Sequence, residues 1–191
     1  MTLAASGASQ PELDMPKIFF PTRSVLALAS ASLACAALAQ GAAVPAADRA
    51  FAEKAAAGGA AEVEAGKVAE QRAANDKVKQ FGARMVQDHG KANDELKQIA
   101  SGKGLQLPTA PEAHEQQEMA RMQKLSGAEF DRAYMDHMVK DHKKDVAEFK
   151  KQASSGKDPE IKAFAAKTLP TLQEHLKMAE AADAEVKKAK H

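Results

Sequence analysis

Residues 128–154 read AEFDRAYMDHMVKDHKKDVAEFKKQAS, and this stretch decides the fold class. Its apolar residues recur every three or four positions, which is the period of one face of an α-helix. Gly127 precedes the stretch and Gly156 follows it, and glycine at such positions is typical of helix boundaries. We therefore expect one long helix here. Its apolar face consists of Phe130, Tyr134, Met138, His142, Val146 and Phe149.

The same period predicts three more long helices, over residues 48–73, 75–101 and 159–188. Glycines and prolines between 102 and 111 interrupt the pattern, and a short helix is expected over residues 112–125. The apolar faces of the three long helices are Phe51, Ala55, Gly58, Glu62, Ala65 and Ala69; then Val78, Phe81, Met85, His89, Ala92, Leu96 and Ile99; then Ile161, Phe164, Thr168, Leu172, His175 and Ala179.

The composition agrees with an all-helical chain. Hydrophobic residues make up 45% of the sequence, but aromatic residues only 4%, and tryptophan is absent. Good helix formers dominate, and β-branched or aromatic runs from which a sheet could be built are missing. Lysine and arginine number 27 against 26 aspartates and glutamates. A nucleic-acid-binding protein would carry a basic face, so this balance argues against such a function.

The chain repeats itself, without a gap, at an offset of 83 residues. Residues 48–51 read DRAF, and residues 131–134 read DRAY. The other matches are Glu62 with Asp145, Val63 with Val146, Val78 with Ile161, Lys79 with Lys162, and Phe81 with Phe164. Two copies of a helical hairpin joined by a long crossover are typical of ferritin-like bundles. We therefore expect an all-α, ferritin-like antiparallel four-helix bundle over residues 48–188, with the short extra helix in the crossover.

The first 39 residues have the pattern of an export signal. Lys17 and Arg23 precede an apolar run over residues 24–36, and Ala37-Leu38-Ala39 is a small-x-small cleavage site. Cleavage near Ala39 would leave a linker over residues 40–47 and place the mature protein in the periplasm or outside the cell.

Two residues of the signal allow further interpretations. Met15 is a candidate start, because the residues before it sit awkwardly ahead of a signal peptide. Cys35 is the only cysteine of the chain, and it would be a lipidation site if the signal were that of a lipoprotein. The Leu33 before it falls one place late for such a signal, so we favour simple cleavage. The mature chain then has no cysteine and no apolar stretch long enough to span a membrane.

One polar residue interrupts each of the four apolar faces near the middle of its helix: Glu62, His89, His142 and His175. The midpoints of antiparallel helices share one layer, so we expect these side chains to meet in the core. Buried imidazoles and carboxylates need partners, and a metal ion would satisfy all four together. Three imidazoles and one carboxylate suit Zn, Fe or Cu.

Acidic residues near these positions are expected to orient the ligands. Asp88, Asp141 and Glu174 each precede a histidine, and each points sideways toward a neighbouring helix rather than toward its own histidine. Asp145 is the repeat partner of Glu62 and could add a second carboxylate to the core. The other histidines, His114, His137 and His191, lie off the apolar faces and are expected at the surface.

Alternatives remain at this stage. The four residues could form a metal-free hydrogen-bond network in a structural or stress-related protein. Met85, Met138 and Met178 lie one helical turn from the histidines, which would suit copper, although methionine more often fills gaps in a core. A redox enzyme using the metal, or a haem protein, ranks lower, because an alanine-rich chain predicts tight helix packing rather than a roomy pocket.

Several motifs together resemble one family. They are AEVEAG at 61–66, Phe81 with MVQDH at 85–89, Phe130-Asp131 with Tyr134, Asp141-His142, and Leu169-Pro170 with Leu172 and His175. Over residues 47–182 the chain is similar to the bacterial exported family known as domain of unknown function 4142, often labelled as an outer-membrane protein. The resemblance implies a ferritin-like bundle and no established role. Val86 and Leu172 stand where a di-iron bundle would carry glutamates, so a single His-rich site fits better.

Overall fold

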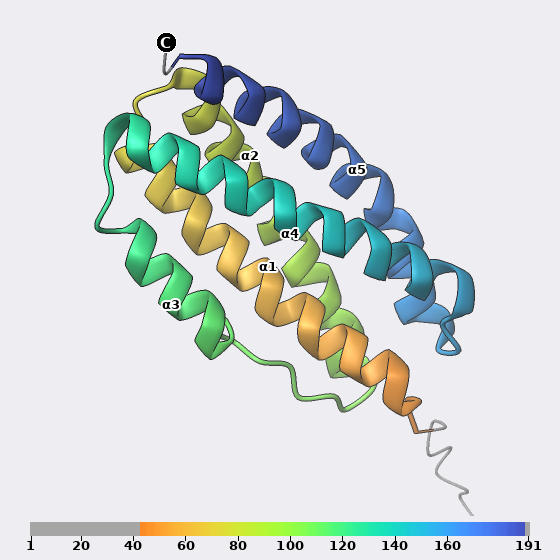
Figure 1. Cartoon of the computed structure of the whole chain (residues 1–191). Coiled ribbons are helices and arrows are strands. Elements are labelled where there is room, and N and C mark those ends of the chain that lie inside the picture. Colours follow the sequence, from red (N-terminus) through yellow and green to blue (C-terminus); the bar gives the residue numbers. More distant parts are fainter. Residues whose placement is uncertain (1–42, 190–191) are drawn as a thin grey trace, which may run out of the picture. The chain divides into compact units, whose positions relative to one another are not determined.

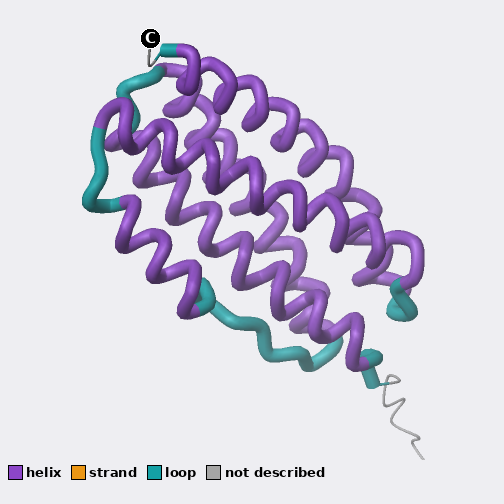
Figure 2. Tube along the Cα trace, viewed as in Figure 1, coloured by secondary structure: helices purple, strands orange, loops and turns teal. Residues whose placement is uncertain are grey.

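The computed structural model describes residues 43–189, and these are all-helical, with no strand among them. Five helices follow one another along the chain (Figures 1 and 2): α1 Ala46–Arg72, α2 Asp76–Gly102, α3 Ala113–Met122, α4 Gly127–Ser155 and α5 Pro159–Lys188. The proposed signal over residues 1–39, with Met15 and Cys35, lies outside the described residues, as do the first part of the linker and His191.

The helix boundaries are close to those expected, and local chemistry explains them. Helix α1 begins two residues earlier than predicted and α3 ends three residues earlier. The Asn75 side chain accepts from the Lys77 N–H at the start of α2, and Asp158 does the same for Glu160 and Ile161 at the start of α5. These caps satisfy N–H groups that a helix leaves free in its first turn.

The end of α2 depends on Gly104, the second residue after the helix. Gly104 has a φ of 65°, a conformation that side chains with a Cβ rarely adopt. The turn it makes lets Leu105 donate its N–H back to the Ala100 carbonyl at 2.9 Å. The chain then leaves α2 and runs toward α3 as the longest described loop (Figure 2).

The four long helices pack as two hairpins. Helix α1 packs along α2, and α4 packs along α5; α1 also contacts α4, and α2 contacts α5. The short α3 lies on the outer side of α1, where it contacts α1 and α4 (Figure 1). No helix in the described part of the chain is both long enough and apolar enough to cross a membrane.

Two buried aspartates connect the hairpins at corresponding positions. Asp48, near the start of α1, accepts hydrogen bonds from the N–H groups of Lys157 and Asp158 in the α4–α5 turn. Asp131, near the start of α4, accepts from the N–H groups of Ala74 and Asn75 in the α1–α2 turn. Donors and acceptors in the two sets differ by the same 83 residues as the sequence repeat.

The expected apolar faces are mostly buried in α2, α4 and α5, but the prediction is off by one residue in the first half of α1. Ala52, Ala56 and Gly59 are buried there, whereas Phe51 and its expected neighbours are only partly covered. This half of α1 is so rich in alanine and glycine that several of its faces are equally apolar. The Phe51 ring instead packs edge-on against Phe149, with 4.9 Å between the ring centroids.

Candidate metal centre

Three histidines from three helices meet between the two hairpins. His89 comes from α2, His142 from α4 and His175 from α5, and one ring nitrogen from each lies within 4.8 Å of the other two. Neighbouring ring centroids are 5.3 to 5.7 Å apart. Glu62 of α1 reaches the same place, so each long helix contributes one side chain. The exposed fraction is 0% for His142 and His175, 5% for Glu62 and 6% for His89.

Each histidine already uses one ring nitrogen to bind a protein acceptor. His89 Nδ1 lies 2.8 Å from Glu62 Oε2, His142 Nδ1 lies 3.0 Å from the Met138 carbonyl oxygen, and His175 Nε2 lies 3.0 Å from Asp88 Oδ2. Because the three partners are acceptors, each of these nitrogens carries the hydrogen. In a neutral imidazole the other nitrogen then carries a lone pair.

Those other nitrogens have no hydrogen-bond partner among the described residues. They are His89 Nε2, His142 Nε2 and His175 Nδ1, and Glu62 Oε1 is in the same condition. Glu62 Oε1 and His142 Nε2 are 3.4 Å apart. Four buried acceptors therefore gather with no donor between them, which is costly. A water molecule can donate only two hydrogens, whereas a metal ion can accept a lone pair from each group.

The ionisation of the cluster favours metal ligation. Burial lowers the pKa of His175 to about 4, although its hydrogen bond to Asp88 opposes the shift. Burial also lowers the pKa of His142, against the attraction of Glu62. Both imidazoles are therefore neutral near pH 7. Burial alone would raise the pKa of Glu62, but the charges of His89 and His142 outweigh it and keep the carboxylate ionised.

Two of the acidic residues picked from the sequence surround His175. Asp88 of α2 bonds His175 of α5, which is a neighbouring helix, and it also pairs with Arg84. Burial raises the pKa of Asp88, but the hydrogen bonds from Arg84 and His175 lower it further than burial raises it. Glu174 is 60% exposed and lies 3.7 Å from Arg84 NH2, at the outer end of this network.

The other two acidic residues lie on the α3 side of α4. Asp141 faces His137 of its own helix, with 2.9 Å between Oδ2 and Nε2, and Lys144, at 3.3 Å from Oδ1. Burial raises the pKa of Asp145 well above its ordinary value, and the carboxylates of Glu62 and Asp141 add to this shift. Asp145 is therefore a neutral acid beside the centre at neutral pH.

His137 is the functional candidate that the sequence pattern missed. Its side chain is only 18% exposed and is enclosed by Asp141 and by Glu115 of α3. The spacing of four between His137 and Asp141 was a visible signal, but Glu115 reaches them only through the packing of α3. His114, in contrast, is 65% exposed, as expected.

A cavity of about 300 Å³ lies between α1, α3 and α4, so the packing is less tight than the alanine-rich sequence suggested. Glu62, His137, Asp141 and Asp145 line it together with Met119 and Met122. Met85 and Met138 belong to the buried apolar cluster around Phe81 and Tyr134, and Met178 packs against that cluster. This placement agrees with methionine as a filler of the core.

Fold and site together define an all-helical protein with a buried glutamate–histidine cluster at its centre. The chain belongs to the family described as domain of unknown function DUF4142, whose model matches residues 33–182. The motifs that carried the resemblance lie within this match, so the family assignment from the sequence is confirmed. No curated protein and no solved structure matches the chain.

Proposed function

We propose that this chain is an exported, ferritin-like antiparallel four-helix bundle that binds one transition-metal ion, Zn²⁺, Cu²⁺ or Fe²⁺, at its centre. The observation that carries the proposal is the set of three buried ring nitrogens, one from each histidine, that face one another without a donor. Glu62 supplies the fourth ligand through Oε1, while its Oε2 orients His89. A mixed set of imidazoles and one carboxylate suits these ions.

The surroundings of the histidines support the same proposal. Histidines that bind a metal usually donate their second N–H to a carboxylate or a backbone carbonyl, which fixes the ring and its tautomer. His89, His142 and His175 all do so here, through Glu62, the Met138 carbonyl and Asp88. A site closed by four protein ligands is typical of binding rather than of catalysis, which needs an open position. We therefore favour a metal-binding protein over an enzyme.

Export is the second part of the proposal, and it rests on the sequence alone. The apolar run over residues 24–36 and the Ala37-Leu38-Ala39 site have the order of a cleavable signal. A mature chain without cysteine suits an oxidising compartment, because it cannot form wrong disulfides there.

The full precursor should be expressed with export intact, and the mature protein should be analysed for metal by mass spectrometry and by titration with Zn²⁺ and Co²⁺. We expect a tight ion that His142→Gln and His175→Gln each remove. The matched control is His114→Gln, which removes an exposed histidine and should leave that ion bound. Circular dichroism checks that each variant is folded.

The opposite result would be substoichiometric metal that added Zn²⁺, Cu²⁺ or Fe²⁺ does not restore. The second candidate function is then a metal-free structural protein, which is favoured by the fact that each imidazole already has one protein partner. That function predicts a folded His142→Leu variant with a higher Tm, because apolar replacements can stabilise more than a buried polar network does.

A further inference from the structure

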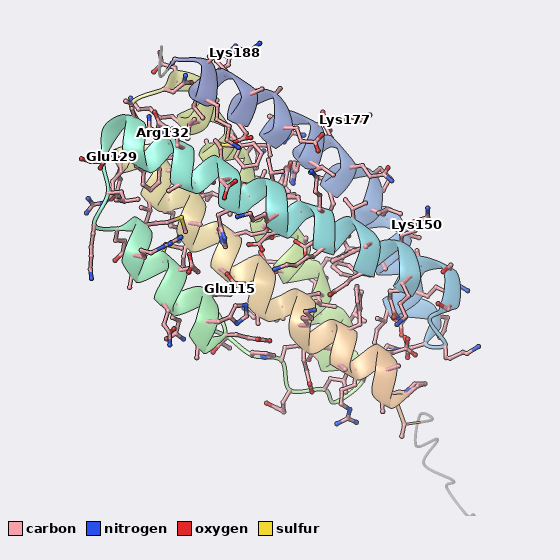
Figure 3. All side chains as sticks on the ribbon, viewed as in Figure 1. Glu115, Glu129, Arg132, Lys150, Lys177 and Lys188 are labelled. Carbon is pink, nitrogen blue, oxygen red and sulfur yellow. The ribbon has the colours of Figure 1, made fainter. Side chains whose placement is uncertain are left out.

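A second group of ligand-type side chains lies outside the proposed centre. Glu115 of α3 meets His137 and Asp141 of α4, and one ligand atom from each lies within 4.8 Å of the other two. His137 Nε2 is 2.9 Å from Asp141 Oδ2 and 3.7 Å from Glu115 Oε2. All three side chains are less than one-fifth exposed. Figure 3 labels Glu115, on the short helix beside α1.

This group is separate from the centre, because of the geometry of α4. His137 and His142 are five residues apart, which on an α-helix corresponds to about 7.5 Å along the axis and about 140° around it. Metals that share ligands in two-metal sites are about 3.5–4 Å apart. The two groups therefore point in different directions and would hold two independent ions.

The cavity connects the second group to the first. Glu115, His137 and Asp141 line the cavity of about 300 Å³, and Glu62 lies on its wall. Glu62 is buried and its Oε1 has no hydrogen-bond partner among the described residues. The other charged groups on the wall are the carboxylates of Glu112, Asp145 and Glu148 and the amines of Lys54 and Lys144. Carboxylates outnumber amines there, so the cavity attracts cations.

We propose that Glu115, His137 and Asp141 bind a divalent transition-metal ion, such as Zn²⁺, Mn²⁺ or Fe²⁺, in this cavity. One imidazole and two carboxylates form a ligand set of mixed nitrogen and oxygen donors that these ions accept. The ion takes the place between His137 Nε2 and Asp141 Oδ2, and the proton of the imidazole leaves. Lys144 holds only the other oxygen of Asp141, from an exposed position, so it is free to move away.

The second site is best tested where the centre has been removed. Zn²⁺ is titrated calorimetrically into the exported, mature His142→Gln protein and into the double variant with His137→Gln. We expect one ion in the first protein and none in the second. Glu115→Gln should weaken binding by about tenfold or more. Its matched control is Glu118→Gln, which removes one charge from the same helix, where Glu118 pairs with Arg121.

Equal weakening by Glu118→Gln and Glu115→Gln would reduce the effect to net charge and overturn the proposal. If His142→Gln does not fold, the wild-type protein is loaded with one equivalent of Zn²⁺ and a second equivalent is followed by histidine side-chain NMR. The second equivalent should shift the His137 resonances, and unshifted resonances would overturn the site. The two proposals fail separately: loss of the centre leaves one His137-dependent ion, and loss of the second site leaves one His142-dependent ion.

Discussion

At the scale of single residues, each histidine of the proposed centre is divided between two tasks. One ring nitrogen anchors the imidazole to a carboxylate or a carbonyl, and the other nitrogen is left for the ion. The anchors differ in strength, because the His142 anchor is a neutral carbonyl, whereas Glu62 and Asp88 are ionised. A charged acceptor makes the imidazole a better donor to the metal and fixes its direction. The carboxylate anchors therefore contribute affinity without touching the ion.

Replacement of Asp88 tests this division. We expect Asp88→Ala to weaken Zn²⁺ binding by about 10–100-fold, because His175 loses the acceptor that fixes its ring. The measurement is calorimetric titration of the mature protein. Glu174→Ala is the matched control, since Glu174 lies near Arg84 NH2 but contacts Asp88 and His175 only through it. An Asp88→Ala variant that binds Zn²⁺ as tightly as the control would contradict the assigned role.

The sequence reached the centre but missed the second group, and the reason is physical. Glu62 and the three histidines interrupt regular apolar faces, so their burial followed from helical period alone. His137 lies off that face, and its enclosure depends on where α3 packs. A short helix with two buried methionines, Met119 and Met122, gives little periodic signal to place it. The partner of Asp88 was foreseen only as far as a neighbouring helix.

At the scale of elements, the closest approach is between α1 and α2, where two glycines face each other. A methyl group built on Gly82 would lie 2.8 Å from Ala69 Cβ and 2.8 Å from the Gly66 carbonyl oxygen. Both distances are too short for atoms that are not bonded. The two helix backbones can therefore pack this closely only because neither glycine has a side chain.

We expect Gly82→Ala to destabilise the protein by about 1–3 kcal/mol, because the two helices must move apart. Gly90→Ala is the matched control in the same helix, since nothing lies within 4 Å of the added methyl group. That control should stabilise the protein by about 0.5–1 kcal/mol through helix propensity. Urea unfolding followed by circular dichroism measures both. Similar effects from the two substitutions would mean that the close approach is not essential.

The turn-binding aspartates give the second prediction at this scale. Asp48→Asn replaces a carboxylate oxygen with an amide that faces backbone N–H donors, and it should cost about 1–3 kcal/mol. Asp131→Asn should cost a similar amount, because its contacts repeat those of Asp48 in the other hairpin. The control is Asp76→Asn, at an exposed position in α2. Urea midpoints compare the three, and a large cost at only one of the two aspartates would argue against equivalent hairpins.

At the scale of the whole molecule, the sequence repeat and the contacts between hairpins tell the same story. The helices followed from period, and the pairing of α1 with α2 and of α4 with α5 followed from short turns between them. The side of α1 that is buried near Phe51 did not follow, because alanine and glycine make its faces alike. The cavity did not follow either, since it depends on the large side chains that α3 brings against α1 and α4.

The buried histidines also set how the metal-free protein responds to acid. An unfolded histidine takes up a proton near pH 6.5, whereas folded His175 does so only near pH 4. Between these values the unfolded state binds more protons, so the free energy of unfolding falls as the pH falls. The loss from His175 amounts to roughly 3 kcal/mol over this range, and the lowered pKa of His142 acts in the same direction. His137, whose pKa Asp141 raises against the effect of burial, stabilises the fold below pH 6.5 and does not oppose the loss within this range.

We therefore expect the urea midpoint of metal-free wild-type protein to drop steadily from pH 7 to pH 4.5. His175→Leu should flatten this slope, because the buried group that resists protonation is gone. His114→Gln is the control and should keep the full slope, since its histidine is exposed. Both variants are measured in chelator, so that metal binding does not contribute. An identical slope in wild type and His175→Leu would show that this imidazole is not held neutral by burial, and the lone pair assigned to its free nitrogen would then be wrong.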